Sequence, residues 1–366
     1  MIYLDHGATS FPKPVPVQKA VLRAMQSCAN PGRGGYGAAM EAAKVVYKCR
    51  EEASRLFLCQ PEQVVFTGNC THGLNIAIRS LVKPGWRVAV SGFEHNAVMR
   101  PLYALGADVH MAGRTLFDWD ELLDSFYKVL CSGVDAAVFT HVSNVFGYVL
   151  PVEELAGMCR EKKIPFIIDA AQSAGSLPVH LRIGADFIAM PGHKGLLGPQ
   201  GTGILLCSQP GVPLHYGGTG TASRDKDMPE DLPERQEAGT MNVPGIAGLC
   251  EGLRYLNQVG TDSVFQKEHE QLKRCVKGLQ KLGMRVYSGP HQAATVSFLS
   301  GEDCEDAAGI LAKQGIAVRA GLHCAPLAHK TAGTLESGTV RVSFGHNASA
   351  TETDRLLRAA SKLTQF

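Results

Sequence analysis

Short apolar runs alternate with longer amphipathic stretches along the first two hundred residues. The runs are rich in β-branched and aromatic residues, which is typical of buried strands in a mainly parallel sheet. The stretches between them carry apolar residues at helical spacing, which predicts repeated β-α-β units. The predicted strands cover residues 64–67, 87–90, 136–140, 166–169, 187–190 and 203–207, and the predicted helices cover residues 36–58, 71–81, 96–105, 119–130 and 152–161.

The pattern changes after residue 207, where five prolines lie among glycines and charged residues up to residue 245. This composition indicates an irregular loop. We therefore expect an α/β fold with a large domain over residues 17–245 and a smaller α/β domain formed by residues 1–16 and 246–366. The elements predicted for the smaller domain are helices over 246–258 and 264–282, strands near Val286 and over 295–299, 316–319 and 339–343, and a last helix capped by Ser349 and Glu352.

Composition and charge narrow the class of protein. Hydrophobic residues make up 45% of the 366 residues and charged residues 19%, which is enough apolar material to bury a core. The chain has 36 Lys and Arg against 34 Asp and Glu, and a net charge of +2 argues against a nucleic-acid partner. Eleven scattered cysteines favour a reducing compartment, and no apolar stretch has the length of a membrane span. We expect a soluble, cytoplasmic protein with no membrane partner.

Reactive side chains follow two of the predicted strands. Lys194 comes shortly after strand 187–190, beside His193 in a glycine-rich turn, where it can form a Schiff base with a carbonyl cofactor. A lysine that pairs with a phosphate or a substrate is the alternative. Asp169 ends another apolar strand, where it can pair with the pyridinium nitrogen of pyridoxal 5'-phosphate or, alternatively, cap a helix.

Two strand-to-helix turns offer further groups. The turn over residues 67–73 contains Cys70 and Thr71 and can direct backbone N–H groups and a hydroxyl at an anion such as phosphate, although such a turn is weak evidence by itself. The next turn, residues 91–96, places His95 at the same edge of the sheet. A helix N-cap is the alternative role for His95.

One cysteine differs from the others in its sequence surroundings. Cys324 lies beside His323 and near Arg319 in a loop bounded by glycine and proline, which favours an exposed, nucleophilic thiol over a buried one. A zinc site made by His323, Cys324 and His329 is a weaker alternative because the ligand spacing is irregular. Arg341, within the strand predicted at 339–343, can clamp a carboxylate or form a surface ion pair.

The order of these motifs resembles that of the class V aminotransferase-like, pyridoxal-phosphate-dependent cysteine desulfurases. Residues 3–9, 143–147 and 237–240 also look like landmarks of that family, so the resemblance spans nearly the whole chain. Residues 319–325 are similar to the group that contains the SUF-type desulfurases and selenocysteine lyases. The resemblance implies fold type I of the pyridoxal-phosphate-dependent transferases, with a mainly parallel seven-stranded sheet in the large domain.

The resemblance also implies a role for each motif residue. Lys194 would hold pyridoxal 5'-phosphate as an internal aldimine, Asp169 would pair with its ring nitrogen and His95 would stack on its ring. The other expected cofactor contacts are Cys70, Thr71, Asn144, Gln172, His193 and, from a second subunit, Thr240. Substrate binding is expected from Arg341, Arg319, Asn144 and Ala8, and no metal is expected.

The implied reaction converts L-cysteine to L-alanine in a homodimeric enzyme. Lys194 would remove the α-proton, and the Cys324 thiolate would attack the substrate sulfur and keep it as a persulfide for an acceptor protein. Iron–sulfur cluster assembly is one expected use of this sulfur. The alternatives are a lyase acting on L-selenocysteine, a class V aminotransferase and a non-catalytic sulfur carrier.

The sequence departs from the pattern of the family in three places. Pro191 stands where SUF-type members carry a serine, Leu322 replaces the first of two histidines, and Cys70, Thr71 and His72 replace a Thr-Thr-Glu type of turn. These changes bear on the phosphate contacts and on the subgroup, and they leave the lysine, the aspartate and the cysteine in place.

Overall fold

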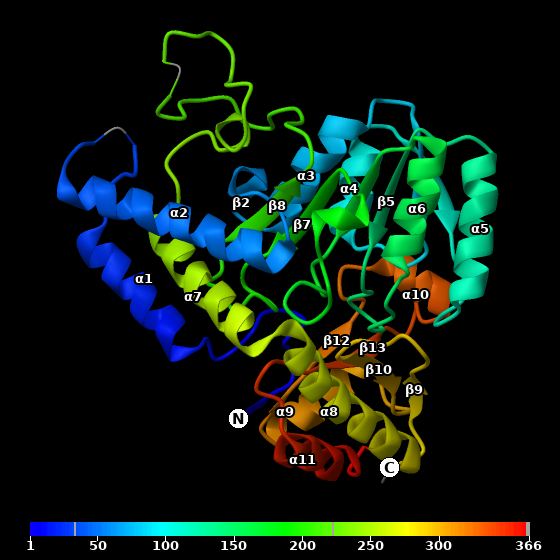
Figure 1. Ribbon diagram of the computed structural model, residues 1–366. Coiled ribbons are helices and arrows are strands. Elements are labelled where there is room, and N and C mark those ends of the chain that lie inside the picture. The colour runs from blue at the N-terminus through cyan, green and yellow to red at the C-terminus, as the bar shows by residue number, and fades with distance from the viewer. Residues whose placement is uncertain (33, 222, 364–366) are drawn as a thin grey trace.

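A twisted seven-stranded sheet forms the centre of the larger of two lobes in the computed structural model, which describes residues 1–32, 34–221 and 223–363 (Figure 1). The strands lie in the order β2-β8-β7-β6-β5-β3-β4, and neighbours are parallel except where β8 pairs with β2 and β7. The expected mainly parallel sheet is therefore confirmed. Its strands are β2 (Val64–Thr67), β3 (Arg87–Ser91), β4 (Asp108–Ala112), β5 (Ala136–Thr140), β6 (Phe166–Asp169), β7 (Phe187–Pro191) and β8 (Gly203–Cys207).

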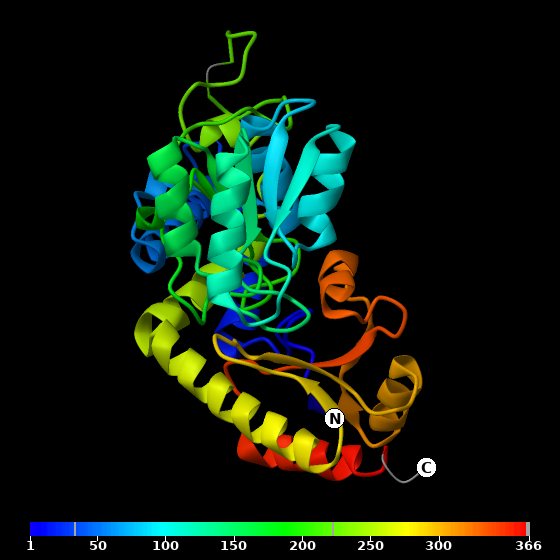
Figure 2. The same cartoon turned by 90° about the vertical axis from the view of Figure 1, so that its right-hand side faces the viewer.

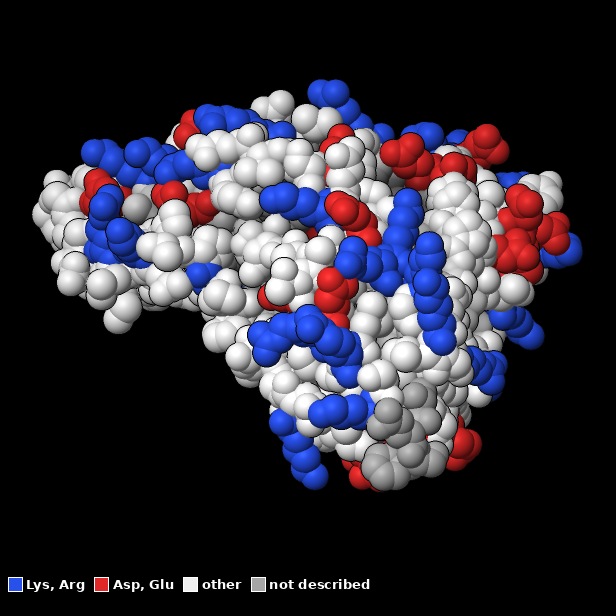
Figure 3. Space-filling view, turned by 90° about the horizontal axis from the view of Figure 1, so that it is seen from below, with Lys and Arg blue, Asp and Glu red and all other residues white. Residues whose placement is uncertain are grey.

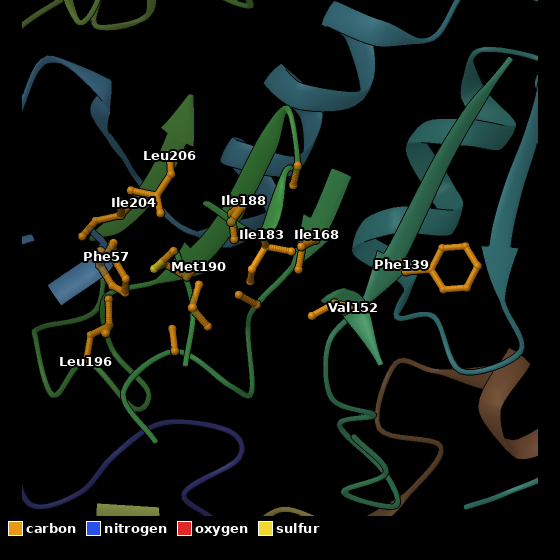
Figure 4. Close-up of a cluster of buried hydrophobic side chains, with 14 of the residues drawn as sticks. Phe57, Phe139, Val152, Ile168, Ile183, Ile188, Met190, Leu196, Ile204 and Leu206 are labelled. Carbon is orange, nitrogen blue, oxygen red and sulfur yellow. The ribbon is translucent and has the colours of Figure 1, made fainter. Parts of the chain in front are cut away.

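Successive apolar side chains of each central strand enter two different cores. Ile188 and Met190 of β7 face one core, while Phe187 and Ala189 face the other, as the two-residue period of a strand requires. Figure 4 shows the first core, in which Ile188, Met190 and Phe57 lie together. This core is covered by α2 (Gly37–Phe57), α5 (Trp119–Cys131), α6 (Val152–Lys162) and α7 (Val243–Val259), and the second by α3 (Cys70–Leu81) and α4 (Asn96–Ala104).

The smaller lobe lies below the larger one and contains an antiparallel sheet in the order β12-β13-β10-β9 (Figures 1 and 2). The long helix α8 directly follows α7 and runs along this lobe, whose core includes Leu272, Phe298 and Leu356. The elements are β9 (Arg285–Tyr287), β10 (Thr295–Leu299), β12 (Arg319–Gly321), β13 (Thr339–Ser343), α8 (Thr261–Lys281), α9 (Cys304–Lys313), α10 (Pro326–Ala332) and α11 (Ala350–Ala360).

The N-terminal segment joins the two lobes. β1 (Ile2–Tyr3) pairs in parallel with β11 (Ile316–Ala317) of the smaller lobe. A few residues later, the backbone N–H of Ser10 donates to the carbonyl of His193 at 2.9 Å. The start of the chain therefore connects the small sheet to the turn that carries Lys194. The helix α1 (Val15–Ser27) follows and packs against α7.

Most of the predicted helices and strands lie within a few residues of the observed ones, and the differences have physical causes. β4 was not predicted because it is an edge strand and has the polar residues Asp108 and His110 among its apolar ones. The single strand expected over residues 316–319 is wrong, since β11 and β12 belong to different sheets. The helices α1, α9 and α10 were not predicted either.

The predicted irregular segment is confirmed over most of its length. Between β8 and α7 the described residues form one short 3-10 turn, Glu234–Gln236, and two further such turns lie at Pro61–Gln63 and Leu181–Ile183. The helix α7 begins at Val243, three residues earlier than expected, because Pro244 is well tolerated in a first helical turn.

The molecular surface carries charges of both signs. Ridges of Lys and Arg alternate with Asp and Glu on the face seen from below in Figure 3. On the outer helices of the smaller lobe, Arg274 of α8 and Asp354 of α11 form an ion pair with a nitrogen–oxygen distance of 2.7 Å. In the described part of the chain, no helix combines the length and apolar character needed to cross a membrane.

Candidate active site

The expected cofactor residues other than Thr240 meet at the carboxyl ends of β5, β6 and β7, where a cavity of about 110 Å³ opens. This is the edge at which parallel sheets bind their ligands. The cavity is lined by Asn69, Cys70, Thr71, His95, Ala97, Thr140, Val142, Asn144, Asp169, Ala171, Gln172, Pro191, His193 and Lys194.

Lys194 follows β7 in the turn that the glycines permit, and it lines this cavity. Loss of hydration lowers the pKa of its amine, and the positive charge of Arg341 lowers that pKa further. Cys70 and Asp169 act in the opposite direction. Because a neutral amine is the nucleophilic and basic form of lysine, the site favours Schiff-base and proton-transfer chemistry at this side chain.

Asp169 ends β6 and is only 2% exposed. Its Oδ1 accepts hydrogen bonds from the backbone N–H of Ala171 at 2.9 Å and from the thiol of Cys70 at 3.5 Å. Burial raises the pKa of this carboxyl group, while the Ala171 N–H and the charge of Lys194 lower it. The contact with Ala171 means that Asp169 caps its own turn as well as facing the cavity.

His95 also combines the two roles that the sequence left open. It is the N-cap residue of α4, where its Nδ1 accepts a hydrogen bond from the N–H of Ala97 at 3.0 Å. The same ring lines the cavity. Burial and then the nearby Lys194 lower the pKa of His95 to about 4, so the imidazole is neutral at physiological pH.

The first turn of α3 forms one end of the cavity. Asn69 caps this helix by accepting from the N–H of His72 at 2.9 Å, and Cys70 and Thr71 begin the helix. Helix N-termini of this kind attract anions through their free N–H groups. His72 turns away from this end, since its Nδ1 accepts from the N–H of Gly68 and its ring meets that of His215 edge to face.

His193 and Gln172 are both held by the N-terminal segment. The Nδ1 of His193 lies 3.1 Å from the hydroxyl of Thr9, and the Nε2 of Gln172 donates to the carbonyl of Gly7 at 3.0 Å. Burial lowers the pKa of His193 to about 4, with Lys194 contributing to the same direction. Both side chains still line the cavity next to Lys194.

Five of the predicted site residues do not line this cavity, namely Thr240, Ala8, Cys324, Arg319 and Arg341. Thr240 lines a separate hollow of about 750 Å³, whose wall also contains the buried ion pair of Arg50 with Glu237. Ala8 lies in a turn of the N-terminal segment, where its N–H donates to the carbonyl of Asp5 at 3.0 Å.

Asp5 is a site residue that the sequence analysis missed. Its Oδ1 accepts from Nη2 of Arg341 at 2.8 Å, and its Oδ2 accepts from Nη2 of Arg319, also at 2.8 Å. Arg341 is 2% exposed and additionally donates to the backbone carbonyl of Asn144 at 3.0 Å. The sequence does contain a feature that could have indicated this role. Asp5 directly follows the apolar residues Ile2 to Leu4, and a carboxylate next to such a run needs a partner when it is buried.

Cys324 is exposed, as predicted, and lies in a loop with an unusual backbone. His323 and Cys324 have φ angles of 49° and 58°, in the left-handed region that few residues other than glycine adopt. Two contacts hold this loop against the larger lobe: the side-chain amide of Asn144 donates to the His323 carbonyl, and the N–H of Asn96 donates to the Cys324 carbonyl, each at 2.8 Å. The backbone of Cys324 is therefore held beside the start of α4, the helix that His95 caps.

The imidazole of His323 is directed into the smaller lobe, whereas Cys324 is exposed at the surface. Its Nε2 lies 3.2 Å from the carbonyl of Thr339. Burial, with Arg341 adding to it, lowers the pKa of His323 to about 3. A neutral ring donating to Thr339 anchors the loop rather than supplying a positive charge to the thiol.

No complete set of zinc ligands is present among residues 1–32, 34–221 and 223–363. The rings of His323 and His329 are 5.7 Å apart, but no cluster of three or more His, Cys, Asp or Glu side chains is arranged to hold a metal ion there. Two of the departures from the family pattern can also be located. Pro191 lies at the end of β7 in the cavity wall. Leu322 precedes His323 and is 37% exposed.

The side chains around the cavity suit pyridoxal 5'-phosphate. The group needs an amine for its aldehyde, a carboxylate for its ring nitrogen and an anion-binding helix terminus for its phosphate. Lys194, Asp169 and the first turn of α3 provide these three groups around one cavity. Among the described residues, the buried Asp169 accepts hydrogen bonds only from the neutral donors Ala171 and Cys70, and a protonated ring nitrogen would compensate for its burial.

Comparison with known proteins agrees with this geometry. The sequence profile of the aminotransferase class-V family matches residues 2–356. A probable cysteine desulfurase of Methanothermobacter thermautotrophicus is 34% identical over 94% of this chain and 90% of its own length, and one of Pyrococcus abyssi is 31% identical over 100% and 94%. The apo structure of a cysteine desulfurase from Thermococcus onnurineus NA1 is similar with a TM-score of 0.90 and 30% identity, covering 100% of this chain and 94% of that one.

These matches cover both lobes, including the β6 and β7 termini and the Cys324 loop, and they agree with the pyridoxal-phosphate-dependent chemistry that the cavity suits. The chain therefore belongs to the aminotransferase class-V family.

Proposed function

We propose that this protein is a pyridoxal-phosphate-dependent cysteine desulfurase that converts L-cysteine to L-alanine and retains the sulfur on Cys324. The observation that carries the proposal is the juxtaposition of two reactive groups from different lobes. A desolvated Lys194 lines the cavity with Asp169, and the exposed Cys324 is tied to the neighbouring helix by the 2.8 Å bond from Asn96. An aminotransferase needs the first group but not the second.

The cofactor would be held by residues of the larger lobe. Lys194 would bind it covalently, Asp169 would face its ring nitrogen and His95 would lie against its ring. Its phosphate would lie at the first turn of α3, formed by Cys70 and Thr71, with His193, Gln172 and Asn144 completing the surroundings. When bound, it supplies an electron sink for the bonds to the α-carbon of the amino acid.

The substrate carboxylate would be bound by Arg341. Burial and the contacts with Asp5 and the Asn144 carbonyl fix the guanidinium, and its Nε is buried without a hydrogen-bond partner in the described part of the chain. Arg319 would act from the outer side of Asp5, since its side chain is half exposed. Ala8 would contribute backbone near Arg341, because it follows Gly7, which lies against the Arg341 guanidinium.

The proton transfers would fall to Lys194 and the sulfur transfer to Cys324. Burial lowers the pKa of the Lys194 amine, which favours the neutral form that can accept the α-proton. The Cys324 thiolate would attack the sulfur of the substrate, so that the carbon–sulfur bond breaks and Cys324 carries a persulfide. The neutral His95, between the two groups, can take up or return a proton.

We further propose a homodimer in which Thr240 completes the site of the second subunit. Support comes from its position on a hollow away from Lys194, and from large apolar side chains exposed on α1 and α2, namely Leu22, Met25, Met40 and Tyr47. The persulfide would pass to an acceptor. Eleven free cysteines are stable in a reducing compartment, so we place the protein in the cytoplasm.

We also propose a division into two domains, with residues 1–16 belonging to the smaller one. The pairing of β1 with β11 supports this assignment. Because Ile246 and Leu253 of α7 enter the core of the larger lobe, the packing favours a boundary near Gly260, after α7, over one at residue 245.

The proposal is tested by alanine formation from L-cysteine and, separately, from L-selenocysteine, with cofactor-loaded protein and a thiol reductant to discharge the persulfide. Alanine from L-cysteine is the expected result. Alanine from L-selenocysteine alone would assign a selenocysteine lyase instead. Alanine from neither substrate would contradict the proposal and favour the aminotransferase or sulfur-carrier alternatives.

A further inference from the structure

An open groove of about 370 Å³ begins at Cys324 and runs between α3 and α4. It shares Thr71, His95 and Ala97 with the cofactor cavity, so the groove and the cavity adjoin, and Cys324 lines the groove. Its walls are Thr71, Asn75, Arg79, His95, Asn96, Ala97, Arg100, Pro101, Ala104 and Cys324.

The groove walls are two helix faces that the sequence arranges at four-residue spacing. Thr71, Asn75 and Arg79 follow one another at i, i+4 and i+8 on α3, and residues 96, 100 and 104 do so on α4. Residues at this spacing share one side of a helix. The small side chains of Ala97 and Ala104 leave room between the helices.

The charge of the groove is positive and uncompensated. Arg79 and Arg100 are exposed, and neither forms an ion pair or side-chain hydrogen bond with a described residue. None of the described groove residues is Asp or Glu. The field of Arg100 reaches the site, since it contributes to lowering the pKa of His95.

We propose that this groove binds the sulfur acceptor and selects a thiol that is flanked by carboxylates. The inference rests on the proposed desulfurase function, which supplies a persulfide on Cys324. The acceptor thiolate attacks the outer sulfur of that persulfide, the sulfur–sulfur bond breaks, and Cys324 leaves as a thiolate while the acceptor becomes the persulfide. Two arginines that line the groove together with Cys324 would orient an acidic acceptor and raise its encounter rate.

The test compares thiol acceptors of different charge on the loaded enzyme at saturating L-cysteine and limiting acceptor. The probes are mercaptosuccinate, which is anionic, 2-mercaptoethanol, which is neutral, cysteamine, which is cationic, and a cysteine peptide flanked by aspartates. The variant is Arg79→Glu with Arg100→Glu. The matched control is Arg355→Glu with Arg358→Glu, an equal charge change on exposed positions of α11.

We expect Arg79→Glu/Arg100→Glu to lower kcat/KM for mercaptosuccinate and for the acidic peptide about tenfold at low salt. The value for 2-mercaptoethanol should stay within about twofold and that for cysteamine should rise, while the α11 control should resemble the wild type. A larger effect on the peptide than on mercaptosuccinate would identify the source of the carboxylates as a polypeptide.

Equal changes for all thiols, or an increased KM for L-cysteine instead, would overturn the inference. If the wild type forms no alanine with any thiol, the proposed function fails rather than the acceptor groove.

A second readout needs no turnover. Iodoacetate is anionic and iodoacetamide is neutral, so the ratio of their alkylation rates reports the local potential at a thiol. We expect the ratio of the iodoacetate rate to the iodoacetamide rate to be higher at Cys324 than at Cys131, the other exposed cysteine of the described chain. In the Arg79→Glu/Arg100→Glu variant, the ratio at Cys324 should fall below that at Cys131. An unchanged ratio at Cys324 would contradict a field from these arginines.

Discussion

Lys194 and Cys324 are the two reactive side chains of the proposed site, and they occupy opposite environments. Lys194 lies within a cavity where desolvation lowers the pKa of its amine, at the end of a buried strand of the larger lobe. Cys324 is exposed on a left-handed loop of the smaller lobe. The chemistry of Lys194 requires the exclusion of water, whereas that of Cys324 requires access for an acceptor.

The two environments are also held in different ways. The position of Lys194 follows from the packed sheet below it, in which Met190 and Ile188 are fully buried. The position of Cys324 depends on a few polar contacts across the lobes, from Asn96 and Asn144. Changes at the first group should therefore affect chemistry at every substrate, and changes at the second should affect only reactions that use the thiol.

Lys194→Ala should have the largest effect. We expect a loss of activity of roughly 10³-fold or more towards both L-cysteine and L-selenocysteine, together with loss of the visible absorbance of the protein-bound Schiff base. The matched variant is Lys13→Ala, because Nζ of Lys13 donates to the His193 carbonyl at 2.7 Å and lies outside the cavity wall. It should keep the absorbance band. A Lys194→Ala protein that kept this band would remove the assignment of the lysine.

Cys324→Ala should reduce the turnover of L-cysteine far more than that of L-selenocysteine. We expect L-cysteine turnover to fall about 10² to 10³-fold, with the Schiff-base absorbance unchanged, while activity on L-selenocysteine persists because the carbon–selenium bond is weaker. Cys131→Ala, at the other exposed cysteine, should behave like the wild type. Undiminished turnover of L-cysteine by Cys324→Ala would show that no persulfide forms on this residue.

Glu268→Gln should have the smallest effect, on stability. Glu268 of α8 faces a second cavity, shared with Lys194, His6 and His346, and burial raises its pKa from 4.5 to about 8. A carboxyl group with a raised pKa in the folded state stabilises the protein fully below pH 4.5, and this contribution is lost as the pH rises to about 8. The wild type should therefore lose stability between pH 5 and 8, by about 1 to 4 kcal/mol more than Glu268→Gln.

Thermal unfolding at several pH values measures this difference, with the exposed Glu270→Gln on the same helix as the control. Glu270→Gln should follow the wild type at every pH. A Glu268→Gln protein that loses more stability than the wild type towards high pH would mean that Glu268 is charged and paired in the cavity.

Much of the fold could be predicted because apolar patterns report burial. The strands that end in Asp169 and precede Lys194 are continuous apolar runs, and such runs fit only the interior of a sheet covered on both faces. β4 lacked this signal, since an edge strand keeps polar residues on its open side. The division of residues 316–321 between two sheets was equally hidden, because both pieces are short and their partners lie far away in the sequence.

The sequence by itself determined the mainly parallel sheet, the reactive groups at its edge and the exposure of Cys324, because strand ends and glycine-bounded loops are local properties of the chain. The tertiary structure alone brings Asp5 between Arg341 and Arg319, directs the His323 ring to Thr339, and places Arg79 and Arg100 in one groove with Cys324. These contacts join residues up to 336 positions apart. No local pattern encodes such a meeting, since it depends on how the two lobes and the N-terminal segment pack together.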